Sequence, residues 1–61
     1  MWDFLFAFNE YSEYEGENFF VETNDLHSAW EIVADNFDPD EVEFIARYSP
    51  EEAEILGYDT Y

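Results

Sequence analysis

The sequence predicts a small α+β domain with the element order ββαβα, in which a three-stranded antiparallel sheet packs on one main helix and a short C-terminal helix follows. Three observations lead to this prediction. Residues 2–8 alternate in the manner of a strand with one buried face. Residues 26–37 carry apolar side chains at helical spacing. The length of 61 residues suits one domain, comprising residues 1–61.

The first two strands are predicted on either side of a glutamate-rich loop. Residues 2–8 form the first strand, and its apolar face consists of Trp2, Phe4, Phe6 and Phe8. Residues 9–17 contain Gly16 among several glutamates and predict a long hairpin loop. Residues 18–23, with their central apolar run, predict the second strand.

The main helix is predicted over residues 26–37. Its inward stripe consists of Leu26, Trp30, Val33 and Phe37, with Ala29 and Ala34 beside it. Thr23 or Asn24 can cap the helix, because a short side-chain oxygen accepts the free amide hydrogens of the first turn. Asp25 then lies near the positive end of the helix dipole.

Residues 42–48 allow two interpretations. Apolar side chains alternate with Glu43, Ile45 and Arg47, which predicts a third strand. The preceding run Asp38-Pro39-Asp40-Glu41 also has the pattern of a helix start, with a cap and a proline at the first position. The strand is favoured because Val, Phe, Ile and Tyr are strand-prone and because a two-stranded hairpin alone is marginal in water.

The last element is a short helix. The run Ser49-Pro50-Glu51-Glu52 forms a capping box, the helix continues through Leu56, and Gly57 ends it before a tail over residues 58–61. A right-handed crossover after the second strand places the third strand beside the first, antiparallel to it, so the predicted sheet order is 2-1-3. The main helix then covers the aromatic face of the first strand, and the opposite face and the loop are predicted to be strongly acidic.

The charge is the first functional clue. The chain has 17 Asp and Glu residues against the single basic side chain Arg47, so its formal net charge is −16. Because 23% of the residues are aromatic, we expect a folded chain and not a disordered acidic tail. Arg47 is expected to pair with Glu43 or Glu41. Repulsion between copies favours a monomer.

The composition excludes several classes of protein. Without cysteine there is no disulfide framework, thiol nucleophile or cysteine-ligated zinc site. No apolar run approaches the roughly 20 residues of a membrane helix, and a charge of −16 opposes direct binding to nucleic acid or an anionic membrane. No carboxyl stands out as a catalytic acid, and so short a chain leaves little room for a substrate cavity. We therefore expect a cytoplasmic protein that is not an enzyme and has no cofactor or metal.

A calcium site is one alternative for the acidic run that begins at Asp38. Four carboxylates, those of Asp38, Asp40, Glu41 and Glu43, lie within six residues. An EF-hand loop needs ligands at alternate positions and a central glycine. Here Pro39 interrupts the run and no glycine is present. Loose association of divalent cations with the acidic surface is therefore expected in place of a specific site.

Two tyrosines, Tyr11 and Tyr14, lie among the loop glutamates. They are either half-buried in loop packing or exposed as a contact pair at an interface, where tyrosine is over-represented.

The chain carries about the charge of a DNA segment of its own length. Duplex DNA has one negative charge per about 1.7 Å of axis, so 16 charges correspond to about 27 Å of duplex. A compact chain of this length has a diameter of about 27 Å. In an extended loop, Glu13, Glu15 and Glu17 would lie on one side about 6.6 Å apart, which is the order of the separation between neighbouring phosphates. A carboxylate also offers Arg a bidentate acceptor, as phosphate does.

In size, charge, aromatic content and near-absence of Lys and Arg, the whole chain resembles the small phage-encoded DNA-mimic inhibitors, namely the anti-CRISPR and antirestriction proteins. The closing run from Ser49 to Asp59 is also similar to the ends of small phage proteins. The resemblance implies a stoichiometric inhibitor that occupies a DNA channel lined by Lys and Arg, often where a CRISPR complex reads the PAM. DNA mimics share charge pattern more than sequence, so no family residue is carried over to a position here.

On this interpretation the protein acts in the cytoplasm of a bacterial host. Its partner is the basic DNA-binding surface of a CRISPR effector, with Cascade-type complexes favoured by the resemblance, or another host DNA-binding protein. The carboxylates expected to bind the partner lie in the loop, on the main helix and around Pro39: Glu10, Glu13, Glu15, Glu17, Glu31, Asp35, Asp38, Asp40, Glu41 and Glu43.

Two other interpretations stay open. The chain could be an acidic adaptor or antitoxin-like module that binds a basic patch on a host protein, such as RNA polymerase, without competing for nucleic acid. It could also be a structural or salt-adapted phage protein with no basic partner. Competition with DNA separates the first alternative from mimicry, and the salt dependence of stability bears on the second.

Overall fold

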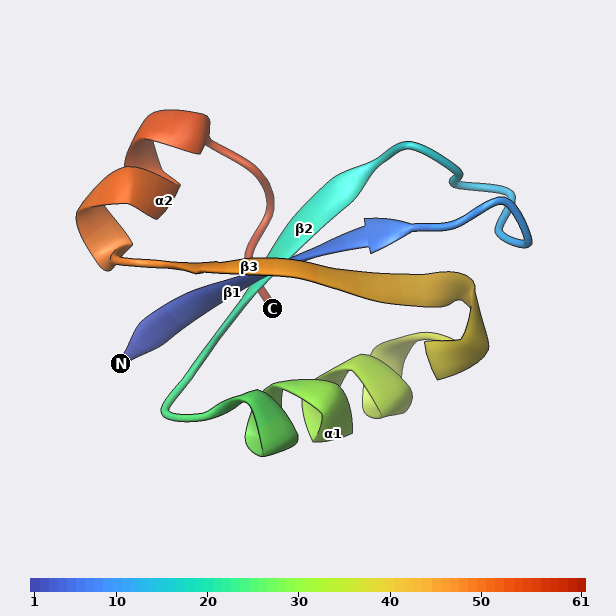
Figure 1. Cartoon of the computed structure of the whole chain (residues 1–61), viewed down its shortest axis with the longest axis horizontal. Coiled ribbons are helices and arrows are strands. Elements are labelled where there is room, and N and C mark those ends of the chain that lie inside the picture. Colours follow the sequence, from blue (N-terminus) through green and yellow to red (C-terminus); the bar gives the residue numbers. More distant parts are fainter.

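Two helices lie on opposite sides of a three-stranded antiparallel sheet (Figure 1). The computed structural model describes all residues from 1 to 61. Its strands are β1 (Trp2–Phe8), β2 (Asn18–Thr23) and β3 (Val42–Tyr48), its helices are α1 (Leu26–Asn36) and α2 (Pro50–Leu56), and a single 3-10 turn, η1 (Pro39–Glu41), precedes β3. The molecule measures 30 × 22 × 15 Å along its principal axes.

The strand order β2-β1-β3 confirms the predicted sheet. β1 lies in the centre and pairs antiparallel with both neighbours, with Phe6 opposite Phe19 of β2. Residues 42–48 form the favoured strand, while the helix-start pattern before them produces only η1. Asp38 caps this turn, because its side chain accepts a hydrogen bond of 3.0 Å from the Asp40 N–H.

Both faces of the sheet are buried, whereas the alternation in β1 predicted only one. The main core lies under α1 and consists of Phe4, Phe6, Phe19, Val21, Ala29, Val33 and Val42. A smaller core on the other face joins Leu5 and Phe20 to Ala53 of α2, with Tyr48 packed against them. The sheet face expected to be an open acidic surface is thus covered by α2. Trp2, at the end of the strand, is 38% exposed.

Asp3 is the charged residue that this arrangement buries. Its strand position places it on the α2 side of β1, and it is only 4% exposed. Removal from water raises the pKa of the Asp3 carboxyl, and the nearby Glu22 carboxylate raises it further.

A β-bulge in β3 reverses the side-chain pattern that the sequence suggested. Phe6 lies opposite Phe44 and the adjacent Leu5 lies opposite Ala46, so Ile45 is the extra residue. Phe44 therefore faces the same side as Phe6, whereas Ala46 and Tyr48 face the α2 side. Tyr48 accordingly packs in the smaller core, and continuous alternation from residue 42 to residue 48 is wrong.

The helix boundaries follow the sequence closely, with one correction at a cap. Asp25, and not Thr23 or Asn24, caps α1: its side chain accepts a hydrogen bond of 2.8 Å from the Ser28 N–H, which lowers the pKa of Asp25. Ala34, expected beside the buried stripe, is exposed. The predicted capping box of α2 is present, and Gly57 ends that helix at φ +73°.

The residues predicted as a tail pair with the free edge of β2. The Phe20 N–H donates to the Asp59 carbonyl at 2.7 Å, and the Tyr61 N–H donates to the Phe20 carbonyl at 2.8 Å. A parallel bridge thus joins Phe20 and Thr60. The pairing covers an edge that would otherwise leave backbone groups open, and it brings the Tyr61 ring onto the main core at 5.3 Å from Phe19.

Candidate functional site

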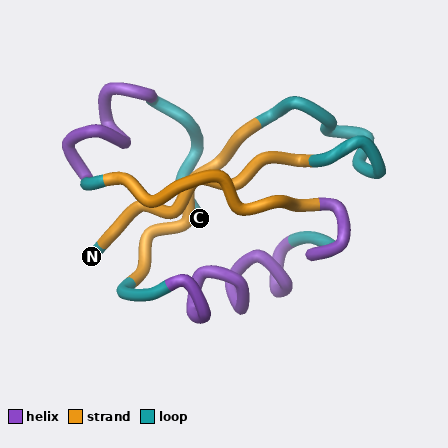
Figure 2. Tube along the Cα trace, viewed as in Figure 1, coloured by secondary structure: helices purple, strands orange, loops and turns teal.

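The loop between β1 and β2 and the turn η1 meet at one end of the sheet (Figure 2). The Asn9 side-chain amide donates to the Asp40 carbonyl at 2.8 Å, and the Asn9 N–H donates to the Glu41 carbonyl at 2.9 Å. Glu43 lies at the same end, opposite Ala7 of β1. We call the carboxylates of this region the acidic end: Glu10, Glu13, Glu15, Glu17, Asp38, Asp40, Glu41 and Glu43.

Short-range hydrogen bonds shape the loop. The Tyr11 N–H donates to the Asn9 side chain at 2.9 Å, and the Tyr14 N–H donates to the hydroxyl of Ser12, which is only 7% exposed, at 3.0 Å. Gly16 adopts φ +88°, a backbone region that favours glycine. None of these bonds uses a glutamate side chain, so the loop's glutamate carboxylates are free to meet a partner.

The loop is a series of turns and not an extended segment. The expected spacing of Glu13, Glu15 and Glu17 along one side of an extended chain is therefore wrong. Turns between residues 10 and 16 distribute the carboxylates around the loop, so any match to phosphates comes from their density and not from a regular row.

Eight of the ten carboxylates predicted to bind a partner belong to the acidic end. The other two, Glu31 and Asp35, are exposed on α1. The Glu31 carboxylate lies 2.9 Å from the His27 imidazole, and no other carboxylate lies within ion-pair distance of a basic group. Asp35, in the last turn of α1, adds negative charge to the negative end of the helix dipole.

The positive groups lie away from the acidic end. The N-terminal amine lies at the opposite end of the molecule (Figure 1). His27 lies in the first turn of α1, and Arg47 lies near the end of β3. Arg47 and the carboxylates of the acidic end are thus separated along the sheet, while α2 carries Glu51, Glu52 and Glu54 at the end away from the loop.

Arg47 does not form the predicted pair with Glu43 or Glu41. Its guanidinium carbon lies 3.9 Å from the centre of the Trp2 ring, in a cation–π contact. Glu43 is four residues away, about 13 Å along an extended strand. The bulge also turns Glu43 and Arg47 toward opposite faces. Strand geometry thus leaves the carboxylates of the acidic end without a cation.

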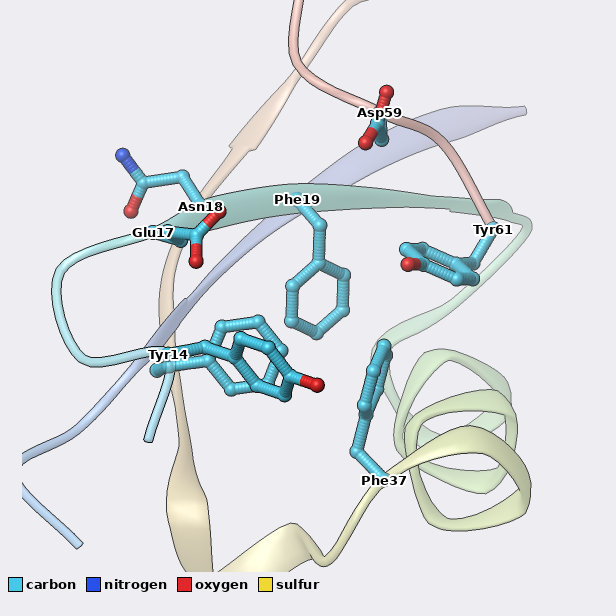
Figure 3. Close-up of a pocket in the computed structure, with 8 residues that line it drawn as sticks. Tyr14, Glu17, Asn18, Phe19, Phe37, Asp59 and Tyr61 are labelled. Atoms are coloured by element: carbon cyan, nitrogen blue, oxygen red, sulfur yellow. The ribbon is translucent and has the colours of Figure 1, made fainter. Parts of the chain in front are cut away.

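An aromatic pocket of about 270 Å³ adjoins the acidic end (Figure 3). Its lining comes from the end of β1, the loop, the start of β2, the residue after α1 and the C-terminal segment. Tyr14 packs on Phe8 at 5.4 Å between ring centres, whereas Tyr11 is 77% exposed. No spacing in the sequence signals this pocket, because Phe37 and Tyr61 reach it only through tertiary packing.

The site has no arrangement suited to a metal. No group of three or more His, Cys, Asp or Glu side chains lies close enough to hold a metal ion. The Asp38 carboxylate, which begins the run considered for calcium, already caps η1. What the acidic end can do chemically is accept hydrogen bonds and ion pairs from cationic groups.

Neither helix has the length and hydrophobicity needed to span a lipid bilayer. Comparison of the chain with models of protein families, with curated proteins and with solved structures found no match.

Proposed function

We propose that this protein is a DNA mimic that inhibits a DNA-binding effector, and that the effector is a CRISPR complex. The acidic end docks in the cationic groove that holds duplex near the PAM, its carboxylates take the places of phosphates, and target DNA is excluded. The observation that carries the proposal is the acidic end itself: eight carboxylates at one end of a small fold, with no cation among them.

The charge density supports this proposal. The chain places a net charge of −16 on a body 30 Å long. Duplex DNA of the same length carries about 18 charges, at one per about 1.7 Å of axis. A carboxylate accepts from a guanidinium in the same bidentate manner as a phosphate. A protein groove built for DNA would thus meet a similar total charge and similar acceptors.

The same charge determines how the protein would associate. Opposite fields steer the encounter, so association should be fast and should slow as salt is added. Repulsion between two copies favours a monomer at ordinary salt. The setting that fits this activity is the cytoplasm of a bacterial host.

Competition with DNA tests the proposal. Effectors loaded with crRNA, Cascade-type complexes first and then Cas9 and Cas12, are incubated with labelled duplex that contains a PAM, and the protein is titrated at fixed salt. We expect loss of DNA binding near a one-to-one ratio, reversed by excess duplex. Unchanged DNA binding across the panel, with restriction enzymes included, would refute the proposal.

A second candidate function has an observation in its favour. Apolar side chains are exposed on β3 and α2, with Ile45 52% and Ile55 84% exposed. A DNA mimic does not need these apolar side chains to dock in the DNA-binding groove of an effector. An acidic adaptor or antitoxin-like module would use them to contact a host protein. Such a module would form a complex that still binds DNA. A ternary complex with labelled duplex would therefore favour the adaptor over the mimic.

A further inference from the structure

The aromatic pocket beside the acidic end has the construction of a site for a cation. Phe19, which is only 2% exposed, lies at the bottom of the pocket. The Phe37 ring packs against the Phe19 ring, with 5.0 Å between the ring centres. Tyr14 lies on one side and Tyr61 on the other, with Phe19 and Phe37 between them (Figure 3). The faces of such rings carry negative electrostatic potential, which attracts a positive group.

Two carboxylates complete the lining. Glu17 comes from the loop and Asp59 from the C-terminal segment. Neither carboxylate has a basic side chain within ion-pair distance. A cation in the pocket would be attracted by the ring faces and by the negative charge of these two lining residues, whereas an anion would be repelled by them.

The backbone holds the walls in place. The Phe8 N–H donates to the Glu17 carbonyl at 3.0 Å, and the Glu17 N–H donates to the Tyr14 carbonyl at 3.0 Å. On the other side, the Tyr61 N–H donates to the Phe20 carbonyl, and the Glu22 N–H donates to the Tyr61 carbonyl at 3.2 Å. The pocket is thus formed before a ligand arrives, which lowers the entropic cost of binding.

Size and chemistry together select the occupant. The volume of about 270 Å³ is below the range of about 300–1,000 Å³ typical of sites for drug-sized ligands. It suits one long side chain. A guanidinium is planar, stacks on aromatic faces and pairs with carboxylates through two hydrogen bonds. The chain itself shows the contact, because Arg47 stacks on Trp2 at 3.9 Å.

We propose that this pocket binds an arginine side chain presented by the partner protein. The identity of the partner rests on the proposed function, but the chemistry of the pocket does not. Docking of the acidic end into a cationic groove places the pocket at the edge of the contact, because Tyr14 and Glu17 belong to the loop. An arginine beside the groove then enters the pocket, and this adds a contact that DNA cannot make.

The direct test uses a short peptide and no effector. Acetyl-Gly-Arg-Gly-amide is titrated into the protein, and the ring protons of Phe37 and Tyr61 are followed by NMR. The matched peptides contain citrulline, which has the same shape without the charge, or lysine. We expect shifts of both rings with the arginine peptide and roughly tenfold weaker binding of the citrulline peptide, as follows from loss of a cation–π contact with a partly desolvated ring.

Two tyrosine variants provide the matched comparison. Tyr14→Leu removes a pocket wall, and Tyr11→Leu removes a tyrosine from the same loop that does not line the pocket. We expect Tyr14→Leu to weaken binding of the arginine peptide by about threefold to tenfold and Tyr11→Leu to leave it unchanged. Equal binding of the arginine and citrulline peptides, equal binding of the arginine and lysine peptides, or equal effects of the two variants would overturn the assignment.

The arginine pocket and the proposed DNA mimicry can be refuted independently of each other. Binding of the arginine peptide without displacement of DNA from any effector would refute the proposed mimicry and retain the pocket. Displacement of DNA by a protein whose Phe37 and Tyr61 rings do not respond to the arginine peptide would refute the pocket and retain the mimicry.

Discussion

Removal of charge from the loop alone is the sharpest perturbation of the acidic end. The variant Glu10→Gln/Glu13→Gln/Glu15→Gln changes the net charge from −16 to −13. All three side chains are exposed, and none takes part in the hydrogen bonds that shape the loop. Glu17 is left intact because it lines the aromatic pocket. The variant should therefore fold like the parent and lose only its contacts with a partner.

The structure sets the size of the effect. Each exposed carboxylate that pairs with a Lys or Arg of the partner contributes up to about 1 kcal/mol. Loss of three such pairs costs up to about 3 kcal/mol, which corresponds to a rise in Kd of roughly 150-fold. We therefore expect inhibition to weaken by roughly tenfold to 150-fold and to depend less steeply on salt.

A control variant with the same net charge isolates the position of the charge. Glu22→Gln/Glu51→Gln/Glu54→Gln removes three exposed carboxylates from the end of β2 and from α2, away from the loop. Displacement of labelled duplex from the effector is measured for both variants at the same salt. We expect the control to stay within about threefold of the parent, since only the long-range field changes. If the two variants lose inhibition equally, total charge and not the acidic end governs binding.

Three further predictions concern stability. The melting temperature should rise as ionic strength increases from about 0.01 M to about 0.15 M, because the Debye length shortens from about 30 Å to about 8 Å and repulsion among the carboxylates weakens; a fall would contradict the picture of unpaired surface charge. The raised pKa of Asp3 means that its carboxylate destabilises the fold at neutral pH, and this cost disappears as the pH falls through the folded-state pKa. The variant Asp3→Asn should therefore be more stable to urea than the parent at pH 7 and lose that advantage in acid. A difference in stability that does not change with pH would show that the charge of Asp3 is not the cause. Phe6→Ala should cost about 3–5 kcal/mol in urea unfolding, because Phe6 is fully buried and its ring contacts Phe19, Trp30 and Phe44; a cost under about 1 kcal/mol would show that the core under α1 is not packed as described.

Local patterns in the sequence were sufficient for the order and type of the elements. Three such patterns depend only on residues close together in the chain: the alternation in residues 2–8, the helical spacing from Leu26 and the capping box at Ser49. The sheet order followed from the handedness of the crossover. Each prediction rests on physics that operates over a short stretch or on a general rule of chain geometry.

Predictions that depended on distant residues were less successful. The bulge at Ile45 has no signal in an alternating sequence, yet it turns Ala46 and Tyr48 to the other face. The cation–π contact of Arg47 depends on Trp2 lying across the strand pair. The segment predicted as a tail, residues 58–61, pairs with Phe20, and no pattern within it predicts that pairing. Each of these outcomes required the position of a partner far away in the chain.

The acidic end also has one feature that follows from composition and one that follows from folding. The excess of 17 carboxylates over one arginine is evident from composition, which is independent of folding. Tertiary folding brings eight of these carboxylates to one end, since Asn9 must reach Asp40 and Glu41 to join the loop to η1. It alone also built the aromatic pocket, because Phe37 and Tyr61 meet Phe19 only after the helix and the C-terminal segment pack on the sheet. Charge is a property of the residues, whereas its concentration at a surface is a property of the contacts between them.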